Sequence, residues 1–258
     1  MKIFGISITS YPRSEVLAQA VDFLHGDTMR FIFTPNAEIL LEARKNTAFR
    51  DVLNKADLSL PDSIGIVLAG KMMGKALPGR IAGVDFALDL ITHAAGHHER
   101  VALVGGGEGI AQKAAAKLAQ RHPGLSVHAG PQSGGLEVKA EGEAEEKDRE
   151  QEIVKRIRDF APQMLLVAFG APKQEFWIAR VAPQLPSVRV AMGIGGAMDY
   201  WAGTVSRAPK WMRACGLEWL WRLLCEPWRV KRIFAAVIIF PLLVIHEAIS
   251  QRRTPKGS

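Results

Sequence analysis

Side chains suited to acid–base chemistry and to binding anions follow several short apolar runs of this chain. Asp62 comes directly after Leu58-Ser59-Leu60 and stands between Pro61 and Ser63. A carboxylate in such a setting can be partly desolvated and can act as a general base. The same side chain could instead cap a helix that begins near Ile64, and the local sequence leaves both roles open.

Three other clusters offer hydrogen-bonding groups after apolar runs. Asn36 follows Thr34-Pro35, and its side chain could either cap a helix or bind a ligand. Gln174 and Glu175 are expected at the start of a helix, where an acidic side chain favours the helix dipole without any ligand. Asp199 lies in a glycine-rich turn and could hydrogen-bond a ribose or sugar hydroxyl.

A run of glycines, Gly105 and Gly106 among them, joins an expected strand to an expected helix and extends to Gly109. Bare backbone N–H groups and a helix N-terminus could hold a phosphate there, although a plain tight turn has the same composition. The run is not a clean G-x-G-x-x-G, and the chain has no G-x-x-x-x-G-K-[ST] motif. Phosphoryl transfer of the P-loop type is therefore not expected.

Histidine and cysteine spacing predicts no metal site. The seven histidines include the pair His97-His98, which we expect in an exposed loop. Cys215 and Cys225 match no metal-ligand spacing, and we expect free thiols, at least half-buried, rather than a disulfide.

Apolar runs alternate with helical patterns along most of the chain. Strands are expected through Ile3, Ile6 and Ile8 and at 29–33, 58–60, 101–104, 126–128, 164–169 and 188–192. Helices are expected after Ser14 as the cap, after Asn36, and at 64–73, 84–95 and 110–120. This order predicts a Rossmann-like α/β fold, with a mostly parallel sheet covered by helices on both faces. Ligands of such sheets bind beyond the carboxyl ends of the strands, so the polar clusters should converge on one crevice.

The C-terminal segment differs from the rest in charge and aromatic content. Residues 207–258 hold ten Lys/Arg and three Asp/Glu, which accounts for the whole formal net charge of +7. A uniformly basic nucleic-acid binder would not have this distribution. We therefore expect a core at 1–204 and a basic, Trp-rich helical appendage at 205–258 that meets anionic ligands or a membrane.

An apolar run, Ile233–Ile245, follows the basic segment. It has 13 residues and contains Pro241, whereas a span needs about 20 residues. The expectation is an interfacial helix on the cytosolic face of a membrane, because the N-terminus also lacks a signal peptide. The side chains of Leu217, Trp221, Leu224 and Trp228 share a helical spacing that suits packing, lipid contact or burial between subunits of a homo-oligomer.

Several motifs occur in the order and spacing of one protein family. They are Thr34-Pro35-Asn36-Ala37-Glu38, Asp62 with Gly65, Arg80 with Gly83-Val84-Asp85, Gly170-Ala171-Pro172-Lys173-Gln174-Glu175, Gly195-Gly196-Ala197-Met198-Asp199, Arg207-Ala208-Pro209 and Glu218-Trp219-Leu220-Trp221-Arg222-Leu223. Over about residues 1–232 the chain resembles the WecG/TagA/CpsF glycosyltransferases, family 26.

The resemblance implies an inverting transferase of the bacterial cell envelope that needs no metal or other cofactor. Members move a sugar, often N-acetylmannosamine or its uronic acid and sometimes glucose, from a UDP-sugar to a saccharide on a polyprenyl diphosphate in the inner leaflet. By position, Asp62 looks like the base that deprotonates the acceptor hydroxyl.

The resemblance also implies which residues surround the substrates. Those expected around the sugars and the diphosphate are Thr34, Asn36, Arg80, Asp85, Gly105, Gly106, Gln174, Glu175, Asp199, Arg207, Arg222 and Arg229. The C-terminal segment resembles the family's membrane-targeting appendage, whose arginines complete the site. Ser63 and Gly79 stand where the family usually has Gly and Glu. The donor sugar of the best-known members therefore cannot be assigned to this chain.

Two other function classes remain open at this stage. A non-catalytic nucleotide-binding module could dock on a membrane or partner through the basic segment. An NAD-dependent oxidoreductase is a third candidate, weakened by the imperfect glycine fingerprint.

Overall fold

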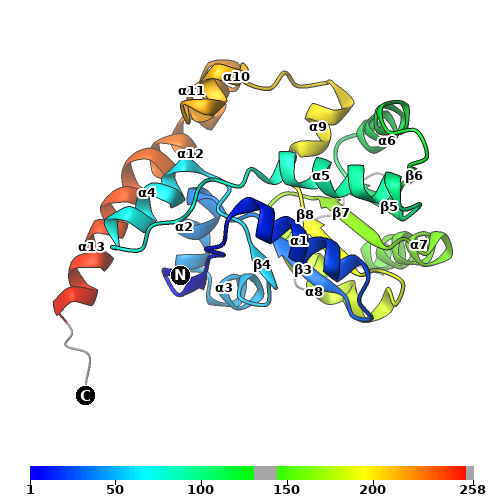
Figure 1. Ribbon diagram of the computed structural model, residues 1–258, viewed down its shortest axis with the longest axis horizontal. Coiled ribbons are helices and arrows are strands. Elements are labelled where there is room, and N and C mark those ends of the chain that lie inside the picture. Colours follow the sequence, from blue (N-terminus) through cyan, green and yellow to red (C-terminus); the bar gives the residue numbers. More distant parts are fainter. Residues whose placement is uncertain (131–143, 254–258) are drawn as a thin grey trace.

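A six-stranded parallel sheet forms the centre of the domain, in the order β4-β3-β8-β7-β5-β6 (Figure 1). The computed structural model describes residues 1–130 and 144–253. The strands are β3 (Arg30–Phe33), β4 (Leu58–Ser59), β5 (Arg100–Gly105), β6 (Ser126–Ala129), β7 (Met164–Ala168) and β8 (Val190–Gly193). Each strand overlaps an apolar run in which a strand was expected, so the predicted α/β fold is confirmed.

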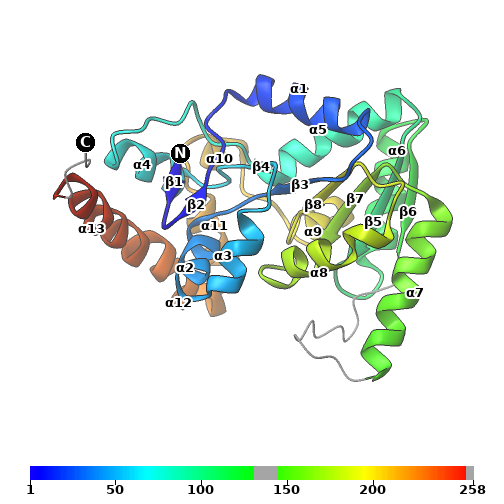
Figure 2. The ribbon, with the colours of Figure 1, turned by 90° about the horizontal axis from the view of Figure 1, so that it is seen from below.

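Helices cover both faces of the sheet (Figure 2). One face carries α1 (Arg13–Leu24), α5 (Gly83–Gly96), α6 (Ile110–Arg121) and α9 (Ala197–Ala202). The other carries α2 (Ala37–Lys45), α3 (Thr47–Leu53), α7 (Ala144–Phe160), α8 (Lys173–Val181) and the turn η1 (Ala182–Gln184), with α4 (Ile64–Met72) beside them. Side chains alternate accordingly: in β5, Val101 and Leu103 pack on the first layer, and Ala102 and Val104 pack on the second.

The N-terminus departs from the prediction. Instead of a strand of the main sheet, β1 (Lys2–Ile3) and β2 (Ile6–Ser7) form a separate antiparallel hairpin. Phe4 and Gly5 have φ angles of 49° and 78°, which is the turn geometry that joins paired strands across two residues. Ser14 is not the cap of α1 either, because the helix begins at Arg13 and its N-cap is Pro12. The short helix α3 was not predicted.

The C-terminal segment is helical and lies along one side of the domain (Figure 1). Its elements are α10 (Lys210–Ala214), α11 (Glu218–Cys225), η2 (Pro227–Arg229), α12 (Val230–Phe234), the π-helical turn η3 (Ala235–Ile239) and α13 (Phe240–Arg253). Phe240 and Val244 are fully buried in the core cluster that also holds residues of α2 and α4. Glu247 accepts a hydrogen bond from the backbone N–H of Phe4 at 3.1 Å. The appendage is thus packed on the core.

The length of the C-terminal helix corrects the expectation that it is too short to cross a membrane. In the described part of the chain, Pro227–Gln251 is a helix of 25 residues that contains an 18-residue window with a mean hydropathy of 2.2, so length and composition do not exclude a span. Pro241 does not end it, because Pro241 stands in the first turn of α13, just after the π-helical turn. One face nevertheless packs on the core, while Phe234, Ile238, Leu242 and Ile245 are exposed.

Cys215 and Cys225 are free as predicted, but both are exposed rather than buried. The stretch 137–152 is rich in acidic residues, a composition typical of a solvated loop and helix start. Its first part falls outside the described residues, and α7 occupies the rest.

Candidate functional site

Asp62 lies beyond the carboxyl end of β4, and two residues of the core, Arg80 and Gly83, hold it in place. One carboxylate oxygen, Oδ1, accepts a hydrogen bond from the backbone N–H of Gly83 at 2.9 Å. Arg80 donates from Nε to the backbone carbonyl of Asp62 at 2.9 Å, and its Nη2 lies 4.0 Å from Oδ1. The carboxylate is therefore oriented by the start of α5 and faces a guanidinium.

The structure excludes one of the two roles that the sequence left open for Asp62, the cap of α4. The N-cap of α4 is Ser63, whose hydroxyl accepts from the N–H of Ile66 at 3.4 Å. The departure from the family pattern at position 63 thus supplies a helix cap and leaves the Asp62 carboxylate unused by α4. Burial raises the pKa of Asp62 to about 6, against the opposing effects of Arg80 and the Gly83 N–H. A carboxylate with this pKa is ionised at neutral pH and more basic than an ordinary aspartate.

Gly83 positions Asp62 because it has no side chain. A Cβ at this residue would lie 2.7 Å from Cγ2 of Thr34, which is closer than real Cβ contacts allow. Thr34 is itself buried at the end of β3, where its hydroxyl donates to the carbonyl of Gly193 at 3.3 Å. The contact between Gly83 and Thr34 therefore fixes the start of α5 against the sheet, next to Asp62.

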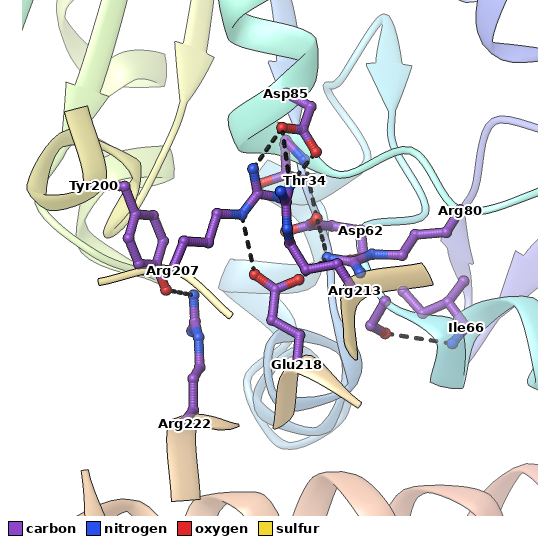
Figure 3. Close-up of polar contacts among 12 residues, drawn as sticks. Thr34, Asp62, Ile66, Arg80, Asp85, Tyr200, Arg207, Arg213, Glu218 and Arg222 are labelled. Atoms are coloured by element: carbon purple, nitrogen blue, oxygen red, sulfur yellow. Dashed lines mark hydrogen bonds and ion pairs between the residues drawn. The ribbon is translucent and has the colours of Figure 1, made fainter. Parts of the chain in front are cut away.

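A chain of ion pairs joins Asp62 and Arg80 to the C-terminal appendage (Figure 3). Nη2 of Arg80 donates to Oε2 of Glu218, on α11, at 2.6 Å. Nε of Arg207 lies 3.4 Å from Oε1 of the same carboxylate, and its Nη2 donates to Oδ2 of Asp85 at 2.8 Å. The hydrogen bond from Arg207 holds the pKa of Asp85 below its usual range. Burial opposes ionisation of Glu218, but Arg80 and Arg207 outweigh it and keep the pKa of Glu218 low.

An open cleft of about 420 Å³ adjoins these ion pairs. Its lining consists of Arg13, Arg80, Ala82, Asp85, Arg207, Arg213 and Ala214. Four arginines and one aspartate line the cleft, so it is rich in positive charge and in N–H donors, part of whose charge Glu218 and Asp89 neutralise. Such a surface suits a phosphate or diphosphate group.

The two remaining predicted arginines lie along the appendage. Arg222 donates to the hydroxyl of Tyr200 at 2.9 Å and lies over its ring (Figure 3). Arg229 pairs with Glu226 on its own segment. Asp199, in the first turn of α9, is close enough to Glu226 and Arg229 for their charges to affect its pKa, which burial raises. Arg222, Arg229 and Asp199 therefore border the junction between α9 and the appendage.

Asn36, Gln174 and Glu175 make hydrogen bonds inside the protein. Asn36 caps α2 by accepting from the N–H of Ile39 at 3.0 Å. Gln174 is buried, accepts from the N–H of Gly195 at 3.1 Å and donates to Glu175 at 2.8 Å. Burial raises the pKa of Glu175 to about 7. Gln174 and Glu175 thus lie beneath the loops that end β7 and β8.

The glycine run forms a tight loop at the end of β5. Gly105 and Gly106 have φ angles of 101° and 77°, and a Cβ at Gly105 would lie 2.7 Å from the carbonyl oxygen of Ala168. The loop then leads into α6 through Gly109, also with positive φ. The loop therefore requires glycine for its own conformation and presents the N-terminus of α6 at the edge where the other strands end.

Sequence reasoning gave no site role to Arg13, Gly83, Tyr200, Arg213 or Glu218, although Gly83 and Glu218 stand in the motifs that carry the family resemblance. One signal was available for Glu218, because it is one of only three acidic residues in the basic segment 207–258. The pairing of Arg207 with Asp85 joins residues 122 positions apart, and only the fold reveals it.

Comparison with known proteins identifies the family. The model of the Glycosyl transferase WecG/TagA/CpsF family matches residues 1–254. A protein of Bacillus spizizenii is 34% identical over 230 residues, which is 89% of this chain and 84% of the relative. A Bacillus subtilis protein is 33% identical over 79% of this chain and 75% of its own length, and a Staphylococcus aureus protein is 30% identical over 88% and 83%. All three are named N-acetylglucosaminyldiphosphoundecaprenol N-acetyl-beta-D-mannosaminyltransferase.

The chain belongs to the WecG/TagA/CpsF family of glycosyltransferases. The resemblance inferred from the motifs is thereby confirmed, and the protein is an enzyme. Neither a non-catalytic nucleotide-binding module nor an NAD-dependent oxidoreductase agrees with this result.

Proposed function

We propose that this enzyme transfers a hexose or N-acetylhexosamine from a UDP-sugar to a saccharide on a polyprenyl diphosphate, with inversion at the anomeric carbon. The acceptor class follows the names of the relatives, which act on an undecaprenol-linked sugar. The observation that carries the proposal is the carboxylate of Asp62. It caps no helix, has a pKa of about 6, and lies next to Arg80 of the arginine-lined cleft.

The proposed step is a single displacement. An Asp62 oxygen accepts the proton of the acceptor hydroxyl while the hydroxyl oxygen bonds to the anomeric carbon of the donor. The bond between that carbon and the diphosphate oxygen breaks, and UDP leaves with the electron pair. Asp62 then returns its proton to solvent. One base on the acceptor side is sufficient for such an inverting transfer.

Negative charge grows on the departing diphosphate in this step, and fixed positive groups would stabilise it. Arg80 and Arg207 are positioned by Glu218 and Asp85, so their guanidinium groups are oriented before substrate arrives. The N-terminus of α6, after Gly105 and Gly106, is a second candidate for holding a phosphate. These groups support a reaction in which no metal ion neutralises the diphosphate.

A lipid-linked acceptor would bring the enzyme to the cytosolic face of the membrane. The appendage has exposed apolar side chains at Trp228, Phe234 and Leu242, beside Lys231 and Arg232. Because the opposite face of the same helix is buried on the core, we favour docking at the interface over a span. The arginines of the cleft would then bind the diphosphate of the acceptor, while the exposed apolar side chains of the appendage meet the membrane that holds its lipid chain.

The test is a donor screen with purified full-length protein. Each UDP-sugar is incubated with a short-chain lipid-diphosphate N-acetylglucosamine acceptor, and the disaccharide product is detected by mass spectrometry. Its anomeric configuration is assigned by NMR. The proposal predicts one preferred donor and a product whose anomeric configuration is inverted relative to the donor. Release of UDP without a glycosylated lipid, or retention of configuration, would overturn it.

A further inference from the structure

A second cluster of chemically active side chains lies at the opposite end of the sheet from Asp62. It consists of His25, directly after α1, His93, in the last turn of α5, and Glu99, directly before β5. The candidate active site lies where the strands end, whereas this cluster lies where β5 begins. Neither the family comparison nor the proposed reaction gives these three residues a role.

The ligand atoms of this cluster converge. One imidazole nitrogen of each histidine and one oxygen of Glu99 all lie within 4.8 Å of one another. Nε2 of His25 is 3.7 Å from Oε1 of Glu99. Around a tetrahedral zinc ion, with bonds of about 2.1 Å, neighbouring ligand atoms are about 3.4 Å apart. The observed arrangement is therefore a small side-chain adjustment away from coordination, and His25 is exposed enough to make it.

Two polar atoms of the cluster are buried with unmet bonding capacity. Among the described residues, Nε2 of His93 and Oε2 of Glu99 have no hydrogen-bond partner, and Glu99 is only 9% exposed. A buried carboxylate oxygen and a buried imidazole nitrogen without partners are costly unless a ligand uses them. A bound cation would satisfy both atoms.

We propose that His25, His93 and Glu99 bind a Zn²⁺ ion. Two imidazole nitrogens and one carboxylate are a recurrent zinc ligand set, which leaves the fourth position to water. Here the partial exposure of His25 admits that water. The His97 ring stacks on His93 at 3.9 Å between centroids, and its Nδ1 lies 2.9 Å from the carbonyl of His93, so it supports the site without being a ligand.

The proposed ion has a structural consequence. It would tie the end of α1 to the end of α5, and the opposite ends of these helices carry Arg13 and Asp85 at the cleft. Arg13 also pairs with Asp89 on α5. Zinc bound here would therefore stabilise the helix pair without taking part in the transfer reaction.

The test is a metal titration of the full-length chain carrying Cys215→Ser and Cys225→Ser, since these exposed thiols would otherwise bind zinc. The apo protein is titrated with Zn²⁺ by calorimetry and with Co²⁺ by visible absorption. We expect one equivalent to bind, a higher thermal unfolding midpoint, and Co²⁺ bands of low coordination number. His25→Ala and Glu99→Gln should each weaken binding by about tenfold or more.

His98→Asn is the matched control, because His98 is adjacent and exposed and has a φ angle of 57° that asparagine tolerates. It should bind zinc like the parent protein. His25→Ala removes an exposed side chain, so loss of binding in this variant with an unchanged unfolding midpoint in EDTA supports the site. No saturable zinc binding, or equal binding by His25→Ala, Glu99→Gln and the parent, would overturn the proposal.

Discussion

The guanidinium of Arg80 and the carboxylate of Glu218 meet at 2.6 Å, although they are 138 positions apart. Arg80 also holds the backbone of Asp62, so this pair connects the candidate base directly to the appendage. Glu218 is 13% exposed and accepts from Arg207 as well. The appendage therefore contacts the candidate site through Glu218.

Removing this connection should loosen the appendage. In Glu218→Gln, Arg80 and Arg207 lose the charge they share, and a charged hydrogen bond of this kind is worth about 1.5–3 kcal/mol. We expect faster hydrogen exchange in α10 and α11, with the sheet unchanged, and a higher KM for the lipid acceptor. Glu152→Gln removes an exposed pair with Arg156 and is the control. Equal exchange in α11 for the two variants would contradict the role given to Glu218.

The close approach of Gly83 to Thr34 predicts a sharp difference between two glycines. Gly83→Ala places a Cβ 2.7 Å from Thr34 and should cost about 1–3 kcal/mol of folding free energy, with loss of transfer activity as Asp62 shifts. Gly79→Ala meets no atom within 4 Å and should leave both unchanged. Urea unfolding and the transfer assay measure the two effects. A fully active Gly83→Ala enzyme would show that the Gly83 N–H does not position Asp62.

The exposed side of the C-terminal helix should determine membrane binding. Phe234 and Leu242 are 57% and 61% exposed and point away from the packed face, so Phe234→Ser and Leu242→Ser should leave the fold intact. Both variants should lose binding to anionic liposomes in a flotation assay. Tyr11→Ser changes an aromatic side chain outside the appendage that is likewise exposed (54%), and this variant should bind like the parent. Undiminished flotation of both appendage variants would exclude this surface.

This packing also changes what truncation is expected to do. The sequence places the end of the core at residue 204, so deletion after this residue would be the simplest way to remove the appendage. Phe240 and Val244 are part of the buried core, however, and Phe240 contacts Phe4 edge to face with ring centroids 5.8 Å apart. A truncated chain would expose this apolar surface, so point substitutions are the cleaner test of membrane binding.

Asp62 should reduce stability at neutral pH. Because its pKa is raised to about 6 in the folded protein, the folded state holds the proton more tightly, and stability falls as pH rises from about 4 to 6. Glu175, with a pKa of about 7, extends the decline in the same direction. Asp62→Asn should therefore gain at most about 3 kcal/mol at pH 7 and almost nothing at pH 4. Urea unfolding at both pH values checks this, with exposed Asp51→Asn as the control. A variant less stable than the parent at pH 7 would contradict the raised pKa.

The sheet was predictable because its strands are short apolar runs followed by polar or glycine residues, as at Phe33-Thr34 and Ala168-Phe169-Gly170. Asp62 was also identifiable as a candidate, but only the structure shows that Ser63, and not Asp62, caps α4. The N-terminal hairpin was missed because alternation at Ile6 and Ile8 does not reveal the partner of a strand. The contacts of Glu218, like the meeting of His25 with Glu99, depend on packing between distant segments.

The most direct test of the account compares Asp62→Asn with the parent enzyme in transfer from the preferred UDP-sugar to the lipid-diphosphate acceptor. If Asp62 is the base, the variant keeps its affinity for UDP while kcat falls by about 10²–10⁴. In the parent, kcat/KM should fall below about pH 6, in step with protonation of Asp62. Turnover by Asp62→Asn within about twofold of the parent, with the same pH profile, would contradict the assignment of Asp62 as the base.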